Sequence, residues 1–493
     1  MRPGPFARAV AVLALTALPG AGHALDLMQT WRTALGKDPT YASARAAYRA
    51  GLEKLPQARA GLLPSVAGLV GGEYDETRTT RGLGRQDSVT RGIWNLSLVQ
   101  PIFDYSRWQN FEQSKLLVAD TEVVLQTAYQ DLMLRVAQAY FDVLAAQDTL
   151  AAIEAEKAAV AEQLAAARRT FELGNATITD TYEAQARYDV IVADELQAQN
   201  DLEITRDILA RILGEPPDAL AELPYNVRLP APQPNRLEDW STQSETASLD
   251  VVRARLRNRI AQYGIEIARG GHYPTLNLEA TTGSASDGVL NGAGPGRPVD
   301  SVVGLNLRIP LYAGGGISSR VTESVELAQA ARHDYEAARR QAIQQARQFF
   351  TGVNTGLARI GALEAGERSS RAAVEANRTG YEIGVRINLD VLNAQQQLYA
   401  TLRDLAQARY NTVMAGLRLK ATSGILSETD LESINQLLRA PGDGPALFEL
   451  ERRPGAAPSG MGTGARPGGS ATPERSSNAR IRTRSLPPIP PSF

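Results

Sequence analysis

The chain has 493 residues, a formal net charge of −2 at pH 7 and no cysteine. A nearly balanced charge gives no electrostatic reason to expect nucleic acid as a partner, and the lack of cysteine excludes disulfide bonds, thiolate zinc sites and a cysteine-linked lipid anchor. Hydrophobic residues make up 43% of the chain but aromatic residues only 6%. This composition favours long helices over compact globular domains.

The first 24 residues have the pattern of an export signal. Arg2 and Arg8 precede an apolar run over residues 9–18, and small residues follow as far as Ala24. This pattern predicts a signal peptide over residues 1–24. A short membrane anchor is the alternative, but the apolar run has about half of the ~20 residues that a spanning helix needs.

The rest of the chain is duplicated at a single offset. The string FELGNATITD begins at Phe171, and the related string YEIGVRINLD begins at Tyr381, 210 positions later. We therefore predict a first structural repeat over residues 25–214 and a second over 237–438. A Pro-rich linker over 215–236 joins them, and a tail rich in Gly, Pro and Arg, predicted to be disordered, covers residues 439–493.

Each repeat is predicted to run helix, strand, strand, long helix, break and helix. The opening helices are expected over residues 27–60 and 237–269. Alternating apolar and polar residues then predict short strands, as at Val303, Leu305 and Leu307. Strands of about ten residues suit a tilted membrane sheet, and an ordinary soluble sheet with one wet face is the alternative.

Four strands per chain leave two open edges, which are costly in lipid because their backbone groups lack partners. If the sheet lies in a membrane, several chains must therefore close it together. Two chains would supply eight strands and a filled interior, whereas three would supply twelve strands and an open lumen.

Very long helices are predicted between Asp104 and Gly214 and between Ser318 and Gly424. The run from Arg107 to Leu173 alone would extend about 100 Å at ~1.5 Å per residue, far beyond the width of a compact domain. Apolar residues keep a heptad-like spacing, so a plain coiled coil is the alternative to a tube of helices.

No enzymatic motif emerges from the sequence. Of the three histidines, His23 lies in the predicted signal peptide, and His272 and His333 are isolated, so no metal cluster is expected. Phosphate-binding loops and nucleophile elbows are also missing. We expect a protein that is not an enzyme and uses no cofactor.

The two duplicated turns carry the polar residues of interest. Gly174 and Gly384 interrupt the helical runs, and an aspartate follows each of them just inside the next helix, where the helix N-terminus favours a carboxylate. The first copy adds Thr179 and the second adds Tyr381 and Arg386. These complementary donors and acceptors predict that the two turns pair with one another.

The chain resembles the TolC family of outer-membrane export ducts over residues 25–438. The resemblance rests on ALGKDPTY, SLVQPIFDYSRW, FELGNATITDTYEAQARYD and YEIGVRINLDVLNAQQQLY, which occur in this order. The resemblance implies an α+β membrane fold in an internally duplicated chain. It also implies a homotrimer in which each protomer gives four strands to a twelve-stranded β-barrel. A long periplasmic α-helical coiled-coil barrel continues it and ends in an iris.

The resemblance also implies a latch that holds the iris closed. Arg386 would pair with Thr179 and Asp180, and Tyr381 would hydrogen-bond to Asp180. Gln163 of a neighbouring chain would hydrogen-bond to Tyr381, and all of these groups are compatible donors and acceptors.

A ring of three carboxylates from Asp390 is implied at the narrowest point of the pore, where it would attract cations. Family members often carry a second aspartate one turn further on, where this chain has Asn393. We therefore expect multivalent cations to block this pore more weakly than a pore with six carboxylates.

The function implied is that of a passive duct in the outer membrane of a Gram-negative bacterium, surrounded by lipid. A periplasmic membrane-fusion adaptor would join it to an inner-membrane ABC transporter, or to a transporter of another kind, for type I secretion of proteins such as toxins. The same duct serving efflux of small molecules or drugs is the alternative, and a periplasmic coiled-coil adaptor is the alternative of another class.

Overall fold

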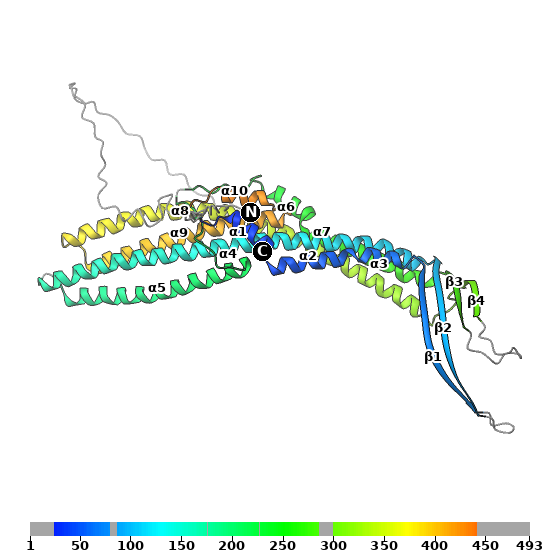
Figure 1. The fold of residues 1–493 in the computed structure, drawn as a ribbon. Coiled ribbons are helices and arrows are strands. Elements are labelled where there is room, and N and C mark those ends of the chain that lie inside the picture. The colour runs from blue at the N-terminus through cyan, green and yellow to red at the C-terminus, as the bar shows by residue number, and fades with distance from the viewer. Residues whose placement is uncertain (1–23, 79–85, 175, 226, 285–298, 441–493) are drawn as a thin grey trace, which may run out of the picture. The chain divides into compact units, whose positions relative to one another are not determined.

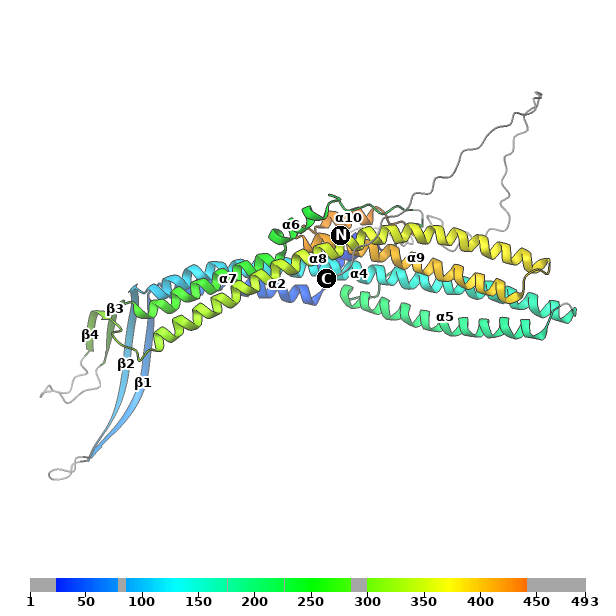
Figure 2. The ribbon, with the colours of Figure 1, turned by 180° about the vertical axis from the view of Figure 1, so that it is seen from behind.

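A computed structural model describes residues 24–78, 86–174, 176–225, 227–284 and 299–440. Except for Ala24, the predicted signal peptide lies outside the described residues, and so does the predicted tail beyond Ala440. Within the described residues, both views place the strands at one end of the long helices and the turns of the helical hairpins at the other (Figure 1; Figure 2).

The helix predicted over residues 27–60 is divided into three: α1 (Leu27–Lys37), α2 (Pro39–Leu52) and α3 (Lys54–Ala60). Asp38 causes the first break, because its side chain accepts a hydrogen bond from the backbone N–H of Tyr41 at 2.7 Å and Pro39 follows it at the first helical position. In the second repeat, Ser248 separates α6 (Leu237–Ala247) from α7 (Leu249–Arg269).

Two helical hairpins dominate the molecule, as predicted. The first consists of α4 (Tyr105–Glu172) and α5 (Ile178–Leu213), and the second of α8 (Gly316–Glu382) and α9 (Asn388–Thr422). With 68 and 67 residues, α4 and α8 each extend about 100 Å at ~1.5 Å per residue. Both hairpins turn at a glycine in the left-handed region, Gly174 at φ 76° and Gly384 at φ 78°.

The sheet is antiparallel with the order β1-β2-β3-β4. Strands β3 (Thr275–Ser284) and β4 (Val299–Arg308) have the expected ten residues, but β1 (Ser65–Arg78) and β2 (Gln86–Phe103) have 14 and 18. The first pair is longer because β2 pairs with β1 as far as Gln86, whereas within the described residues its pairing with β3 stops at Asn95, opposite Gly283.

The strand register gathers apolar side chains on one face of the sheet. Leu98 lies opposite Val66 on one side and Ala280 on the other, and Leu278 lies opposite Leu305. The opposite face is mainly polar. In a single chain the apolar face is largely uncovered: Val70, Val303 and Leu305 are 86%, 74% and 68% exposed. Residues of this apolar face are Val66, Val70, Trp94, Leu96, Leu98, Leu276, Leu278, Ala280, Val303, Leu305 and Leu307.

The main hydrophobic core lies partway along the helices, where α1, α4, α5, α9, the linker between the repeats and the short helix α10 (Glu428–Asn435) meet. Tyr140 is fully buried in this core and donates a hydrogen bond to the backbone oxygen of Ala221 at 2.7 Å. The rings of Phe141 and Tyr410 stack with centroids 5.7 Å apart. This core fixes α4 against α9 and therefore one hairpin against the other.

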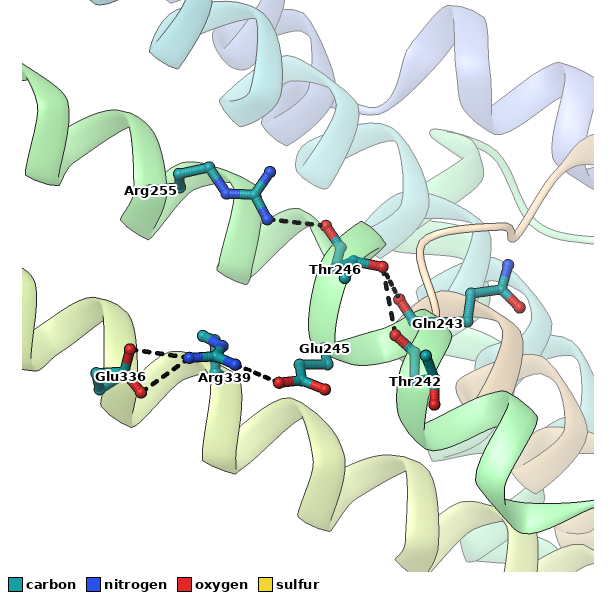
Figure 3. A network of polar contacts seen from close by, with 7 residues as sticks. All are labelled: Thr242, Gln243, Glu245, Thr246, Arg255, Glu336 and Arg339. Atoms are coloured by element: carbon teal, nitrogen blue, oxygen red, sulfur yellow. Dashed lines mark hydrogen bonds and ion pairs between the residues drawn. The ribbon is translucent and has the colours of Figure 1, made fainter.

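Polar contacts join the second repeat's short helices to α8 (Figure 3). Arg339 of α8 forms an ion pair with Glu245 of α6 and donates to both carboxylate oxygens of Glu336, at 2.9 and 3.0 Å. On the other side of α6, Arg255 of α7 donates to the backbone oxygen of Thr246 at 3.5 Å. The ion pair of Arg339 with Glu245 holds α6 beside the N-terminal half of α8.

Candidate functional site at the turns of the two hairpins

The first turn joins α4 to α5 and stabilises its own helix start. The Thr177 hydroxyl accepts a hydrogen bond from the backbone N–H of Asp180 at 3.4 Å, and the Asp180 carboxylate accepts one from the backbone N–H of Thr177 at 3.2 Å. This reciprocal capping box satisfies two amides that a helix start leaves unpaired. Asp180 is therefore engaged locally, while Thr179 beside it is exposed.

The second turn joins α8 to α9 without such a box. After Gly384, the backbone N–H groups of Val385 and Arg386 both donate to the backbone oxygen of Gly380, at 2.8 and 3.0 Å. The Arg386 guanidinium lies 3.7 Å from the carboxylate of Asp390, the third residue of α9. Both side chains are partly open to solvent, and Asn393 one turn on is exposed.

Asn388, the first residue of α9, brings the two turns together. Its side-chain oxygen accepts a hydrogen bond from Nε2 of Gln163 on α4 at 2.5 Å, and its side-chain nitrogen donates to the backbone oxygen of Asp180 on α5 at 3.1 Å. Asn388 is completely buried. The role of Asn388 was not predicted from the sequence, although one signal was available: the equivalent position in the first repeat is the apolar Ile178.

None of the predicted latch contacts forms within the described residues of one chain. Within the described residues, neither Arg386 nor Tyr381 forms a hydrogen bond or ion pair with Asp180, and Gln163 bonds to Asn388. The hydroxyl of Tyr381 is buried and has no hydrogen-bond partner in the described part of the chain. The contacts between neighbouring chains remain predictions.

Farther from the turns, Glu156 joins three helices. Its carboxylate, on α4, lies 3.0 Å from Arg187 of α5 and 3.8 Å from Arg403 of α9, and only 3% of the residue is exposed. Burial raises the pKa of the Glu156 carboxyl, and the two arginines oppose that rise.

Asp148 of α4 occupies a half-buried polar position facing α9. The hydroxyl of Tyr410 donates a hydrogen bond to the Asp148 carboxylate at 2.6 Å. Burial raises the pKa of Asp148 to about 6, and this hydrogen bond opposes the rise. Beside it, Arg409 is 3% exposed and donates to the backbone oxygen of Pro224 in the linker at 2.6 Å.

Within the described ranges, no group of His, Cys, Asp and Glu side chains is arranged to hold a metal ion. No helix in the same ranges is both long enough and apolar enough to cross a membrane.

The chain is similar in sequence to known outer-membrane and secretion proteins. The sequence profile of the family described as outer membrane efflux protein matches residues 31–215 and 240–424. The chain is 33% identical to outer membrane protein TolC of Escherichia coli (strain K12) over 439 residues, which are 87% of this chain and 88% of that protein. It is 32% identical to the proteases secretion protein PrtF of Dickeya chrysanthemi over 430 residues, which are 84% of this chain and 91% of that protein.

The fold is also that of a solved outer-membrane protein. VceC of Vibrio cholerae matches with a TM-score of 0.69 at 19% identity, over 81% of this chain and 96% of that one. The sheet continued by long helical hairpins, together with the family profile, places the chain in the class of outer-membrane efflux proteins. The chain belongs to the outer membrane efflux protein family. It is an outer-membrane export duct for protein secretion or efflux, its long helices form the periplasmic part, and its family consists of channel proteins.

Proposed function

We propose that three copies of this chain form a passive duct that exports proteins by type I secretion, joined by a periplasmic adaptor to an inner-membrane ABC transporter. The proposal of a protein cargo rests on the similarity to PrtF over 84% of this chain, because the name of PrtF describes protease secretion. Efflux of small molecules is the second candidate, favoured by the description of the family itself.

Trimer formation is supported by the unfinished sheet. One chain offers four strands with an exposed apolar face and two sheet edges, β1 and β4, that pair with no other strand among the described residues. Three such sheets joined edge to edge would give twelve strands, enough for an open lumen, with the apolar face toward lipid.

The latch at the turns is proposed to act mainly between chains. Arg386 has a side chain 58% exposed, and Thr179 is exposed as well, so both are accessible to a neighbouring protomer. Among the residues that the structure describes, the buried hydroxyl of Tyr381 lacks the hydrogen-bond partner that such a group normally has. Asp180 and Gln163 are the acceptors that the latch requires, and each already holds a contact within its own chain.

The constriction of the pore is proposed at Asp390. Three copies of this carboxylate would focus cations, and the Arg386 guanidinium at 3.7 Å would partly neutralise each one. Asn393 leaves the ring with one carboxylate per chain.

Deleting the gene and comparing the secreted proteins and the drug sensitivity of the cells tests the cargo. We expect a secreted protein to disappear from the medium while sensitivity to small amphiphiles changes little. The opposite result would favour efflux.

Fractionation tests the duct itself, because a heat-modifiable trimer is expected in the outer membrane, whereas a periplasmic adaptor would be recovered in soluble or inner-membrane fractions.

A further inference from the structure

Asn388 is buried within a turn that is otherwise open to solvent. Its neighbours Ile383, Val385 and Ile387 are 70%, 74% and 59% exposed, whereas Asn388 has no exposed surface. A fully buried amide is stable only when its donor and acceptor are both satisfied. Both are satisfied by the first hairpin, through Gln163 and the backbone of Asp180.

The turn itself does not need this asparagine. At the equivalent position, the first repeat makes the same glycine turn and starts α5 with Ile178, which is 42% exposed. Within the described part of the chain, the polar side chain therefore serves a contact of the second copy, where the start of α9 meets α4 and α5.

The same end of α9 has one apolar contact with the first hairpin. Leu392, one turn beyond Asn388, is 3% exposed and packs in a cluster with Val160, Leu164 and Ala184. Asn388 and Leu392 thus attach the tip of the second hairpin to the first. For α9 to swing away from α4 and α5, both hydrogen bonds of Asn388 must break.

We propose that Asn388 is a clasp within each chain that sets the closed position of the second hairpin, in addition to the latch between chains. The proposal rests on the proposed function as a gated duct. Its bonds join uncharged groups in a buried place, so added salt should not weaken them, whereas contacts of the exposed Arg386 should weaken as salt screens them.

The test is single-channel conductance of purified full-length trimers in planar bilayers. Asn388→Leu keeps a similar volume and removes both hydrogen bonds, while Gln163→Leu removes one. We expect Asn388→Leu to raise the occupancy of the higher-conductance state roughly two- to tenfold for each hydrogen bond lost. Because both changes remove the same bond between Gln163 and Asn388, the double variant should exceed Asn388→Leu only by the effect of losing the proposed contact of Gln163 with Tyr381 of a neighbouring chain.

The matched control is Asn200→Leu, the same substitution at an exposed position of α5, which should behave as the parent. Asn388→Leu should raise the occupancy of the higher-conductance state equally at about 0.1 M and about 1 M KCl, once the currents are corrected for the conductivity of the solution. Charges are screened over ~10 Å at the lower salt concentration and over ~3 Å at the higher one. A rise that disappears at high salt would overturn the uncharged clasp.

A second measurement does not depend on the stability of the leucine variant. Because the chain has no cysteine, Gln163→Cys with Asn388→Cys creates the only thiols, and a short bifunctional thiol reagent can join them. We expect the cross-linked duct to stay closed and the reduced one to open more readily than the parent. Equal conductance in both forms would refute the clasp.

The controls also separate the clasp from the duct. If Arg386→Ser opens the channel while Asn388→Leu behaves as the parent, the clasp is wrong and the gated duct stands. If no variant and no parent protein conducts ions, the proposed function fails together with the clasp.

Discussion

At the scale of single residues, the two turns have the same backbone and different side-chain contacts. Gly174 and Gly384 both adopt a left-handed conformation that other residues resist. Asp180 is used to cap its own helix, whereas Asn388 is used to hold a neighbouring hairpin. Duplication therefore preserved the turn and left the contacts free to differ.

The charge of the constriction gives the first prediction. Asn393→Asp adds a second carboxylate one turn from Asp390 in each chain. We expect a trivalent cation to block this variant at a roughly fivefold lower concentration than the parent, because the attraction between a cation and a nearby carboxylate is worth ~1 kcal/mol even in water. Titrating the cation against single-channel current measures this. Asn200→Asp, on the exposed surface of α5, is the control, and equal block of all three proteins would exclude a ring at this position.

The raised pKa of Asp148 gives a prediction about pH. Its pKa rises from an ordinary 3.8 to about 6, chiefly through burial, with Glu222 adding to the rise and Tyr410 and Arg409 opposing it. Folding therefore favours the protonated carboxyl, so its stabilising contribution is complete below about pH 4 and is lost as the pH rises through 6.

We expect Asp148→Asn, which keeps an acceptor for the Tyr410 hydroxyl, to stabilise the fold at about pH 8 and to do so less at about pH 5. At pH 8 the free energy of unfolding of Asp148→Asn should exceed that of the parent by on the order of 2 kcal/mol. This is less than the energy that corresponds to the full pKa shift, because solvent reaches part of the side chain. Thermal unfolding followed by circular dichroism measures it. Asp404→Asn, exposed on α9, should show no such pH dependence; parallel curves for parent and Asp148→Asn would contradict the assignment.

At the scale of helices, one carboxylate joins elements that are distant in sequence. Glu156 of α4 faces an arginine on α5 and another on α9, so it links the first hairpin to the second. Asn388 and the core around Tyr140 are further places where α9 touches the first hairpin. A movement of α9 during opening must change some of these three contacts.

We predict that Glu156→Gln destabilises the helical part by about 1 to 3 kcal/mol. Removing one partner of a buried ion pair typically costs ~3 to 5 kcal/mol, and Arg187 and Arg403 retain 24% and 30% of their side-chain exposure, which lowers the cost. Thermal unfolding of purified trimers measures it. Glu203→Gln removes an exposed pair with Arg206 and should change stability by less than ~1 kcal/mol; an equal effect of both variants would contradict the link.

At the scale of the whole molecule, the sheet is the incomplete element. Its apolar face is uncovered by the chain's own helices, which is the arrangement that lipid requires and water does not favour. The long hairpins are also mostly exposed in one chain. The main core is confined to the region where the short helices and the linker surround the hairpins.

The two faces of β4 give a matched pair of substitutions. Leu305→Arg puts a charge on the apolar face, which costs ~2 to 4 kcal/mol near the middle of a bilayer, whereas Asn306→Arg puts the same charge on the mainly polar face. We expect the first variant to reduce the yield of heat-stable trimers in the outer membrane and the second to leave it near the parent level. Equal yields would show that this face does not meet lipid.

Much of the fold follows from local sequence patterns. The alternation in the strands and the long runs without helix breakers predicted the sheet and the two hairpins, because both patterns act over a few neighbouring residues. The duplication extended these predictions to the second repeat. The first helix was predicted as one piece and is three, since Asp38 followed by Pro39 was not recognised as a cap and restart. The strand lengths of the first pair were underestimated, because pairing between strands extends an element beyond its own alternation.

The sequence alone determined that the chain is built twice, where it turns, and which residues of each turn are polar. Only the tertiary structure decided which of those polar residues meet across the two hairpins: it buried Asn388 between Gln163 and the backbone of Asp180. The reason is physical. Turns and periodicities are set by residues a few positions apart, whereas the partner of a buried amide 225 positions away depends on how two complete hairpins pack.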